Sequence, residues 1–397
     1  MVKDVNYNFN VPYYRLELDD QEINSVVNVL RSGWLTTGPQ VAAFEQEFAE
    51  FVGGGVQAVA LASNTAGLHL VLESLGIKSG DEVIVPTLTF TATAEVVRYL
   101  GAEVSFVDVN PDTLCIDPKA IEAAITPRTR AIMPVHFGGR PCDMEAIWAI
   151  AGSRGIPVVE DAAHAIPTEI DGVHVGAGAS AAAVFSFYAN KTLTTGEGGM
   201  IVSRDPKLIA RCKVMRLHGI DRDSFERFTS NTAQWRYDIV APGFKYNLTD
   251  IAGSLGRTQL ARVEKHQVAR ERIAMRYLEE LADLPLVLPA LPAQNLKHSW
   301  HLFPVQLPVD TKVTRDDLEE GLSSRGVGNS VHYKPLHQMT YWRTRYRLSD
   351  KKFPVATSYA SRCLSLPIFP SMQEHEISHV IEVLRDLLAP SFNQANV

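Results

Sequence analysis

Short apolar runs alternate with amphipathic stretches along roughly the first 220 residues of the chain. Runs rich in Val, Ile and Ala that are bounded by polar or turn residues predict strands buried on both faces. The segments between them carry apolar residues at helical spacing. We therefore predict strands at 56–62, 81–86, 104–109, 130–135, 156–160, 181–187 and 200–203, and helices at 22–31, 40–51, 68–75, 95–100, 118–125, 143–153 and 206–217. This alternation predicts an α/β fold whose mainly parallel sheet is covered by helices.

The pattern changes after residue 218. Residues 219–242 are polar and lack apolar periodicity, which predicts a long and functional loop. A long helical region over 250–281 then leads into a Pro-rich connector. Beyond it we expect a strand at 299–307, a helix at 315–325, a strand near Val331, a loop, and a helix at 373–388. The sequence thus predicts a large α/β domain over residues 1–260, including the N-terminal helices, and a small α+β domain over 261–397.

Composition excludes several classes of function. The formal net charge of −7 leaves no basic footprint for nucleic acid or an anionic membrane. The four cysteines are scattered without a C-x-x-C pair, so we expect neither a metal site nor a disulfide framework. The first residues lack the apolar core of a signal peptide, and no apolar run approaches the length of a membrane span. We therefore expect a cytoplasmic protein.

One lysine stands apart from the other charged residues. Lys191 follows the predicted strand 181–187 in an apolar and hydroxyl-rich setting, and Gly196, Gly198 and Gly199 follow it closely. A desolvated lysine loses its proton more readily and becomes the nucleophilic amine of Schiff-base enzymes. A lysine on an ordinary turn, with its head in water, explains this stretch equally well. The rest of the chain has to decide between the two.

Further polar groups fall at the ends of the predicted strands, where parallel sheets bind ligands. Ser63 and Thr65 lie between a strand and a helix, a setting that can hold phosphate on backbone N–H groups. Taken alone, this stretch is better explained by an ordinary capped turn. Asp161 and His164 follow the strand 156–160, although they could equally be a helix cap and a core histidine. Together with Lys191, a phosphate turn and a buried carboxylate are what pyridoxal phosphate (PLP) requires. We expect Phe90 to cover the pyridine face.

The motifs also carry a family resemblance. They read G-W-L-T-T-G-P, A-L-A-S-N-T-A-G-L, V-P-T-L-T-F-T-A-T, V-V-E-D-A-A-H-A, S-F-Y-A-N-K-T-L-T-T-G-E-G-G, G-F-K-Y-N-L-T-D-I and V-H-Y-K-P-L-H. With them the chain resembles the nucleotide-sugar aminotransferases of the DegT/StrS type. These are fold type I PLP enzymes, which implies a seven-stranded sheet in the large domain.

The resemblance also implies roles for individual residues. Lys191 would form the Schiff base and shuttle the proton, with Asp161 at the pyridine nitrogen and His164 beside the ring. The cofactor phosphate would be held by a set of hydroxyl and backbone groups, namely Ser63, Thr65, Ala66 and Ser186. These enzymes are homodimers with shared sites, so Lys245 or Asn247 would reach into the neighbouring subunit's site. Tyr188 stands where the family often has histidine, which blurs the substrate class. The dehydratase branch replaces the lysine with histidine, so Lys191 argues against that branch.

The resulting prediction is transamination in two halves. An amino acid, L-glutamate in our expectation, would aminate the cofactor, which would then aminate a keto group on a nucleotide-linked deoxysugar. The expected substrate-binding residues lie in the loop 33–39 and in the small domain, namely Trp34, Thr36, Thr37, His332, Tyr333 and His337. An ordinary turn and plain surface residues are the alternatives for these positions. A cyclitol or amino-benzoate precursor is an alternative substrate, and a PLP-bound regulator without turnover is the alternative of another class.

Overall fold

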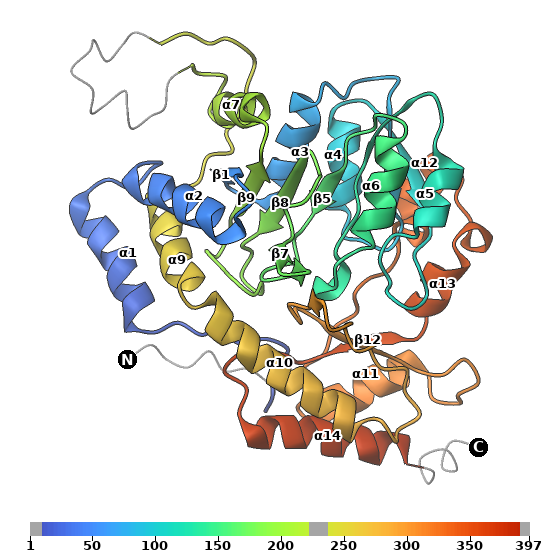
Figure 1. The fold of residues 1–397 in the computed structure, drawn as a ribbon. Helices are drawn as coiled ribbons and strands as arrows, with labels where there is room; N and C mark the ends of the chain where they lie inside the picture. The colour runs from blue at the N-terminus through green and yellow to red at the C-terminus, as the bar shows by residue number, and fades with distance from the viewer. Residues whose placement is uncertain (1–9, 222–236, 390–397) are drawn as a thin grey trace.

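The structure is a computed structural model that describes residues 10–221 and 237–389. A sheet with helices on both faces occupies the upper part of Figure 1. Its strands are β1 (Gln57–Leu61), β2 (Glu82–Pro86), β3 (Glu103–Val107), β4 (Thr129–Ile132), β5 (Val159–Asp161), β8 (Ala182–Ser186) and β9 (Gly199–Ser203). They run in the order β1-β9-β8-β5 and β3-β2-β4, and parallel bridges between the β4 and β5 segments join the two groups. The prediction of a mainly parallel sheet is confirmed, and β9 is the exception because it runs antiparallel to both of its neighbours.

Alternating side chains of each strand enter two different cores. In β1, Val59 and Leu61 face one core while Ala58 and Ala60 face the other. The first core packs against α3 (Asn64–Ser74), α4 (Ala92–Tyr99) and α7 (Pro206–Met215). The opposite face packs against α2 (Pro39–Val52), α5 (Pro118–Ala124) and α6 (Met144–Gly152). The near-continuous apolar strands are thus explained by burial on both faces.

Two glycines allow α3 and the strands beside it to approach closely. A Cβ atom on Gly67 would lie 2.4 Å from Cγ1 of Val184 in β8. A Cβ atom on Gly199, at the start of β9, would lie 2.5 Å from the backbone carbon of Ser63. Because real Cβ atoms do not approach so closely, both positions require glycine as long as α3 keeps this place.

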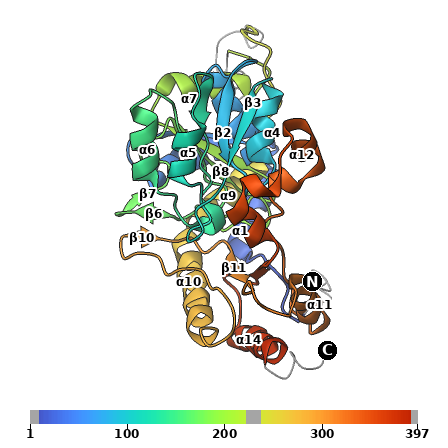
Figure 2. The same cartoon turned by 90° about the vertical axis from the view of Figure 1, so that its right-hand side faces the viewer.

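A further core lies below the sheet. Its elements are α10 (Val263–Glu280), β11 (Phe303–Gln306), α11 (Arg315–Ser324), β12 (Cys363–Leu366) and α14 (Glu374–Leu388). Figure 2 shows α10, α11 and α14 gathered beneath the sheet. Val11 packs in this core and bridges Val327, so a segment near the N-terminus belongs to it as well. The predicted division into domains 1–260 and 261–397 remains a proposal, because this N-terminal segment packs in the core of the C-terminal part.

Several predicted boundaries are wrong. The helix expected from Leu68 begins at Asn64, because Ser63 accepts a hydrogen bond from Ala66 N–H and caps it. The helix expected over 250–281 is two helices, α9 (Asp250–Leu260) and α10, with a turn at residues 261 and 262. The side chain of Arg262 in that turn makes ion pairs with Glu17, Asp19 and Glu22 beside α1 (Asp20–Ser32).

The loop expected between Val331 and residue 373 is also wrong, because it contains regular structure. It holds the short helices η2 (Leu336–Gln338), α12 (Thr340–Tyr346), η3 (Asp350–Lys352) and α13 (Pro354–Ala360), followed by β12. Sequence reasoning also missed η1 (Phe137–Gly139) and a small sheet of β6 (Glu169–Ile170), β7 (Val173–His174) and β10 (Leu296–Lys297). Most of the predicted loop 219–242 lies outside the described residues. No helix in the described ranges combines the length and the apolar character needed to cross a membrane.

Candidate active site

Lys191 lies in the turn that connects β8 to β9. The turn is closed by backbone bonds, because Lys191 N–H donates to the Tyr188 carbonyl and Thr195 N–H donates to the Phe187 carbonyl. The side chain is half-buried, and its Nζ lies 3.4 Å from Nε2 of His301. Burial lowers the pKa of Lys191 to about 8, against the opposing charge of Asp161. A useful fraction of this lysine is therefore an unprotonated amine near neutral pH.

Asp161 is the last residue of β5, and its carboxylate is buried. The hydroxyl of Thr93 donates to Oδ2 at 2.7 Å, and Ala163 N–H donates to Oδ1 at 3.2 Å. Asn64 holds its amide 3.4 Å from Oδ1 and donates to the Val184 carbonyl at 2.9 Å. Burial raises the pKa of Asp161, while the hydrogen bonds from Thr93 and Ala163 and the charge of Lys191 oppose the rise. The carboxylate is solvated by dipoles, which leaves it able to attract a cation.

His164 is held in one tautomer. Gly138 N–H donates to its Nδ1 at 3.2 Å, so the proton of the neutral ring belongs on Nε2, which lies 3.0 Å from the Tyr333 hydroxyl. Burial lowers the pKa of His164 well below its ordinary value, so the ring is neutral. Its ring is tilted by 43° to that of His301, with the ring centroids 4.5 Å apart. The structure thus brings together Lys191, Asp161, His164 and Tyr333 around one centre.

The predicted phosphate turn is the first turn of α3. A helix start leaves backbone N–H groups without intrahelical partners, and those of Asn64 and Thr65 belong to it. Ser186 is buried at the end of β8, where its hydroxyl accepts from Tyr188 N–H at 3.4 Å. Because α3 packs against β8 through Gly67, this helix start lies at the same end of the sheet as Lys191. Such a helix start is suited to an anion.

The expected substrate loop and the expected cross-subunit pair form one hydrogen-bonded unit. The indole of Trp34 donates to the Thr37 carbonyl at 3.1 Å, and Asn247 donates to the Thr37 hydroxyl at 2.8 Å. The exposed Lys245 bonds to the Asn247 side chain. The Thr36 carbonyl accepts from the Asp250 N–H, which ties the loop to the start of α9. Asn247 also bridges Leu61 at the end of β1, so the unit lies beside the start of α3.

The remaining candidates occupy different settings. His332 bonds to Ser365 at 2.9 Å, and burial with the charge of Lys191 lowers its pKa to about 4. His337 is fully buried, and both of its ring nitrogens are engaged, by Thr87 at 2.8 Å and Thr357 at 2.9 Å. In this structure His337 therefore anchors η2 and offers no free nitrogen to a substrate. The exposed ring of Phe90 lies 6.2 Å from that of Tyr333.

Three residues of the site were missed by sequence reasoning. Thr93 and Asn64 both hold Asp161, and His301 contacts Lys191. Thr93 and Asn64 stand inside the quoted motifs, so their polar character in the first turns of the helices α4 and α3 was an available signal. His301 comes from a segment far along the chain and offered none.

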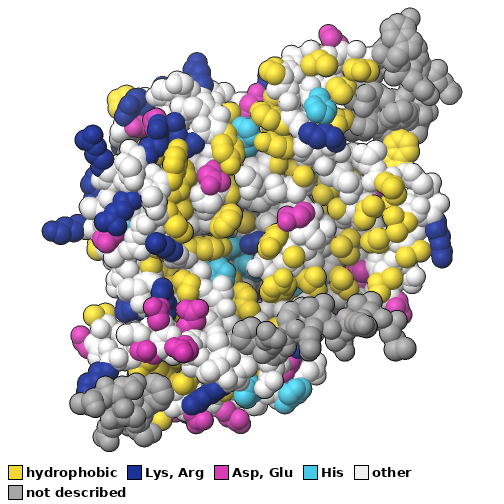
Figure 3. Space-filling model, turned by 180° about the vertical axis from the view of Figure 1, so that it is seen from behind, with side chains coloured by type: hydrophobic (Ala, Val, Ile, Leu, Met, Phe, Trp, Pro, Cys, Tyr) yellow, Lys and Arg dark blue, Asp and Glu magenta, His cyan; other side chains and the backbone are white. Residues whose placement is uncertain are grey.

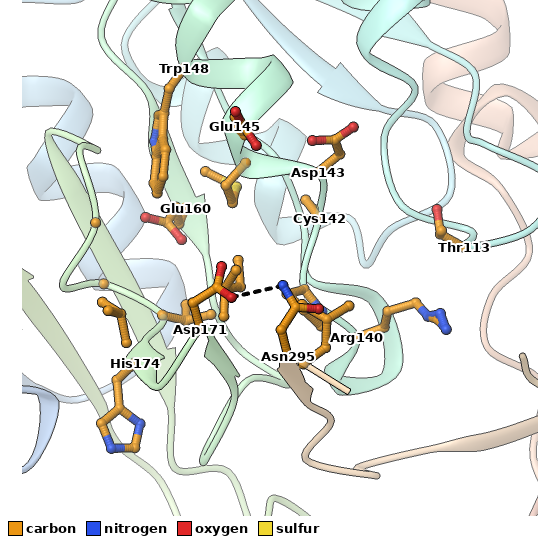
Figure 4. Close-up of a pocket in the computed structure, with 18 residues that line it drawn as sticks. Thr113, Arg140, Cys142, Asp143, Glu145, Trp148, Glu160, Asp171, His174 and Asn295 are labelled. Atoms are coloured by element: carbon orange, nitrogen blue, oxygen red, sulfur yellow. Dashed lines mark hydrogen bonds between the residues drawn. The ribbon is translucent and has the colours of Figure 1, made fainter. Parts of the chain in front are cut away.

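A separate cavity of about 590 Å³ lies on the other side of β5. Its walls include Trp148, Cys142 and Glu160, and Asn295 donates to Asp171 across it, as Figure 4 shows. Lys191, Asp161 and His164 are not among its lining residues. We therefore place the candidate active site at Lys191 and not in this cavity.

Residues 16–385 match the DegT/DnrJ/EryC1/StrS aminotransferase family. The chain belongs to that family. It is 42% identical over 385 residues to the spore coat polysaccharide biosynthesis protein SpsC of Bacillus subtilis (strain 168), covering 96% of this chain and 98% of that protein. Among solved structures, Spr1654 of Streptococcus pneumoniae is 30% identical with a TM-score of 0.89, covering 95% of this chain and 99% of that one. The sugar aminotransferase CalS13 of Micromonospora echinospora is 29% identical with a TM-score of 0.83, again covering 95% and 99%.

This aminotransferase uses PLP as its cofactor, and Spr1654 has been solved in PLP- and PMP-forms. The donor set of the site fits the group. Lys191 offers an amine for its aldehyde, and Asp161 offers a buried carboxylate, held by hydrogen bonds, for its ring nitrogen. The start of α3 offers N–H groups for its phosphate.

When bound, PLP supplies an electron sink for the bond broken at the amino-bearing carbon.

Proposed function

We propose that this aminotransferase transfers an amino group from an amino acid, with L-glutamate as the expected donor, to a keto group on a nucleotide-linked deoxysugar. The half-buried Lys191, in contact with His301 and within the charge field of Asp161, is the observation that carries the proposal, because an amine with a lowered pKa serves both as nucleophile and as base. The polysaccharide role of SpsC and the sugar substrate class of CalS13 support the choice of acceptor.

The residues have distinct tasks in this proposal. Lys191 holds the cofactor aldehyde and then moves a proton at the amino-bearing carbon. Asp161 keeps a proton on the ring nitrogen, and His164 orients the ring from its fixed tautomer. Ser63, Thr65, Ala66 and Ser186 hold the phosphate. We assign contact with the substrate or with a second subunit to the hydrogen-bonded unit of Trp34, Thr36, Thr37, Lys245 and Asn247, together with Phe90, His332 and Tyr333.

The test has two steps. Glutamate added to the purified holoenzyme should shift the cofactor absorbance to that of the pyridoxamine form, and keto-sugar nucleotides should then restore the original spectrum. Borohydride reduction and peptide mapping should place the label on Lys191. A spectrum that glutamate shifts, but that only cyclitol or benzoate ketones restore, would replace the acceptor while keeping the transamination chemistry.

We also propose a cytoplasmic homodimer with shared sites. Leu35, Phe90 and Tyr188 are exposed in loops that also carry site candidates. Figure 3 shows histidine and basic side chains at the centre of a face rich in hydrophobic side chains. A second copy covering this face would bury apolar surface and bring the exposed Lys245 towards another phosphate site.

Complementation tests the shared site. Lys191→Ala chains are mixed with chains that carry Lys245→Ala and Asn247→Ala, each preparation being inactive alone. In mixed dimers with shared sites one site carries both lesions and the other is intact, so random exchange should restore about a quarter of the wild-type activity. Mixing Lys191→Ala with Asp161→Ala is the matched control and should restore nothing, because both residues serve one chain's site. No recovery in the first mixture, despite proven exchange, would assign each site to a single chain.

A further inference from the structure

Two buried histidines flank the site, and their hydrogen bonds differ. The ring of His164 is bonded at both nitrogens, with Gly138 N–H donating to Nδ1. The ring of His301 has a partner at Nε2 only, which is Lys191 Nζ at 3.4 Å. Its Nδ1 is buried and makes no hydrogen bond to any residue within the described ranges. Since Nδ1 of His164 is an acceptor, Nε2 of that ring must donate, whereas Nε2 of His301 is available to accept.

The backbone around His301 is held firmly in place. The Ser299 hydroxyl donates to the His164 carbonyl at 2.6 Å, and Leu302 N–H donates to the Gly138 carbonyl at 3.1 Å. The buried Arg270 donates to the Trp300 carbonyl at 3.2 Å. These hydrogen bonds hold the backbone on both sides of His301, whose ring centroid lies 4.5 Å from that of His164. Burial and the charge of Lys191 lower the pKa of His301 well below its ordinary value, so this ring is neutral.

A neutral acceptor suits the lysine in both of its protonation states. The ammonium and the amine of Lys191 each carry N–H groups that can donate to Nε2. Donation from the amine leaves its lone pair free, whereas a donor at this place would occupy that lone pair. A carboxylate at this position would hold the ammonium more strongly and would raise the lysine pKa.

We propose that His301 is a positioning residue that holds Nζ of Lys191 by accepting an N–H through Nε2 and leaves the lone pair free to attack. The inference rests on the PLP chemistry of the family and not on the identity of the sugar substrate. It separates the two histidines by task, with His164 facing the cofactor ring and His301 facing the lysine.

The experiment measures covalent attachment of PLP to the full-length apoenzyme. The amine attacks the aldehyde carbon and water leaves as the C=N bond forms, which is followed by absorbance. In His301→Leu the limiting rate at high pH should fall by up to about tenfold, the upper end of what one hydrogen bond between neutral groups contributes. The midpoint of the pH dependence should also move to lower pH, because the ammonium loses an acceptor.

Three comparisons make the result specific. The binding of pyridoxamine phosphate needs no lysine attack and should stay within about threefold of wild type, a change of less than one hydrogen bond. His301→Gln should restore the rate through its amide oxygen. His298→Leu removes another buried imidazole of the same segment, one that accepts from Trp300 N–H and does not contact Lys191. This control should attach PLP at the wild-type rate.

Wild-type attachment in His301→Leu, or an equal fall in pyridoxamine phosphate affinity, would overturn the proposal in favour of a packing role. If the leucine variant does not fold, His301→Asn replaces it, since the shorter amide cannot reach Nζ. A rate in His301→Asn equal to that in His301→Gln would then contradict the proposal. The acceptor sugar does not enter these measurements, so a failed sugar screen leaves the outcome unaffected.

Discussion

Two adjacent carboxylates on β5 have opposite environments. Asp161 and Glu160 are both buried, but successive side chains of a strand point to opposite faces of the sheet. Asp161 faces α3 and α4 and accepts from a hydroxyl and an amide, and in the described ranges it makes no ion pair. Glu160 faces the other side, where His136 Nε2 donates to its Oε2 at 2.8 Å. The Nδ1 of His136 accepts from Cys142 N–H, so the proton of this imidazole lies on the side of Glu160.

The difference shows how neighbours decide what a buried carboxylate does. The charge on Asp161 is stabilised without being neutralised, so a cationic ring nitrogen can still gain from it. The charge on Glu160 already has a donor, and its second oxygen, at the wall of the cavity in Figure 4, is buried without a partner in the described part of the chain. Asp161 is therefore placed for chemistry, and Glu160 is placed for holding β5 to the His136 segment.

The largest expected effect is at Asp161, the carboxylate that we assign to the cofactor ring nitrogen. Asp161→Asn should retain the cofactor but lose at least a hundredfold in transamination rate, about 3 kcal/mol or more, because an amide cannot keep a proton on the ring nitrogen. Single-turnover kinetics with glutamate measures this loss. Near-normal turnover in Asp161→Asn would break the comparison at its central point.

A smaller effect is expected at the hydroxyl that holds Asp161. Thr93→Val removes the 2.7 Å hydrogen bond, which lowers the pKa of this carboxyl, so the pKa should rise further. The acidic limb of the rate profile should move to higher pH, and the rate at neutral pH should fall about tenfold, the value of one charge-assisted hydrogen bond. Thr89→Val is the control, because Thr89 contacts Thr93 at 2.8 Å and not the carboxylate. Equal profiles for the two variants would show that Thr93 does not tune Asp161.

The smallest effect on the transamination rate is expected at Glu160, the carboxylate that accepts a hydrogen bond from His136. Glu160→Gln exchanges a charge-assisted hydrogen bond to His136 for a neutral one, which should cost about 1 kcal/mol of unfolding free energy. The transamination rate should stay within about threefold of wild type, less than the effect of a lost hydrogen bond. Denaturant titration of the apoenzyme, compared with kinetics of the holoenzyme, separates the two quantities. A rate loss as large as that of Asp161→Asn would mean that the two faces of β5 are not independent.

The sequence predicted the sheet well because its strands are buried on both faces and read as apolar runs. It could not predict that β9 runs antiparallel, since an apolar run carries no direction. The break between α9 and α10 was hidden because residues 261 and 262 continue the helical spacing, whereas the ion pairs of Arg262 that hold the turn join residues far apart in the sequence.

The site was predictable where local motifs carry it. Lys191, Asp161 and His164 lie at the ends of recognisable strands, and the structure brings them together. His301 was out of reach because its partner is 110 residues away along the chain. His337 was named from a motif, but its environment depends on Thr87 and Thr357, whose approach no local pattern reveals.

The lack of a side chain at Gly67 sets the distance between α3 and β8. Without a Cβ atom, α3 lies directly on Val184 of β8, the strand that leads to Lys191. In the proposed function the start of α3 holds the cofactor phosphate and Lys191 holds its aldehyde, so the thickness of this contact decides whether one rigid molecule reaches both groups at once. In Gly67→Ala the added carbon would meet Val184 at 2.4 Å, and α3 would have to lift away from the strand. The absence of a Cβ atom at Gly67 thus sets the distance between the start of α3 and the strand that leads to Lys191.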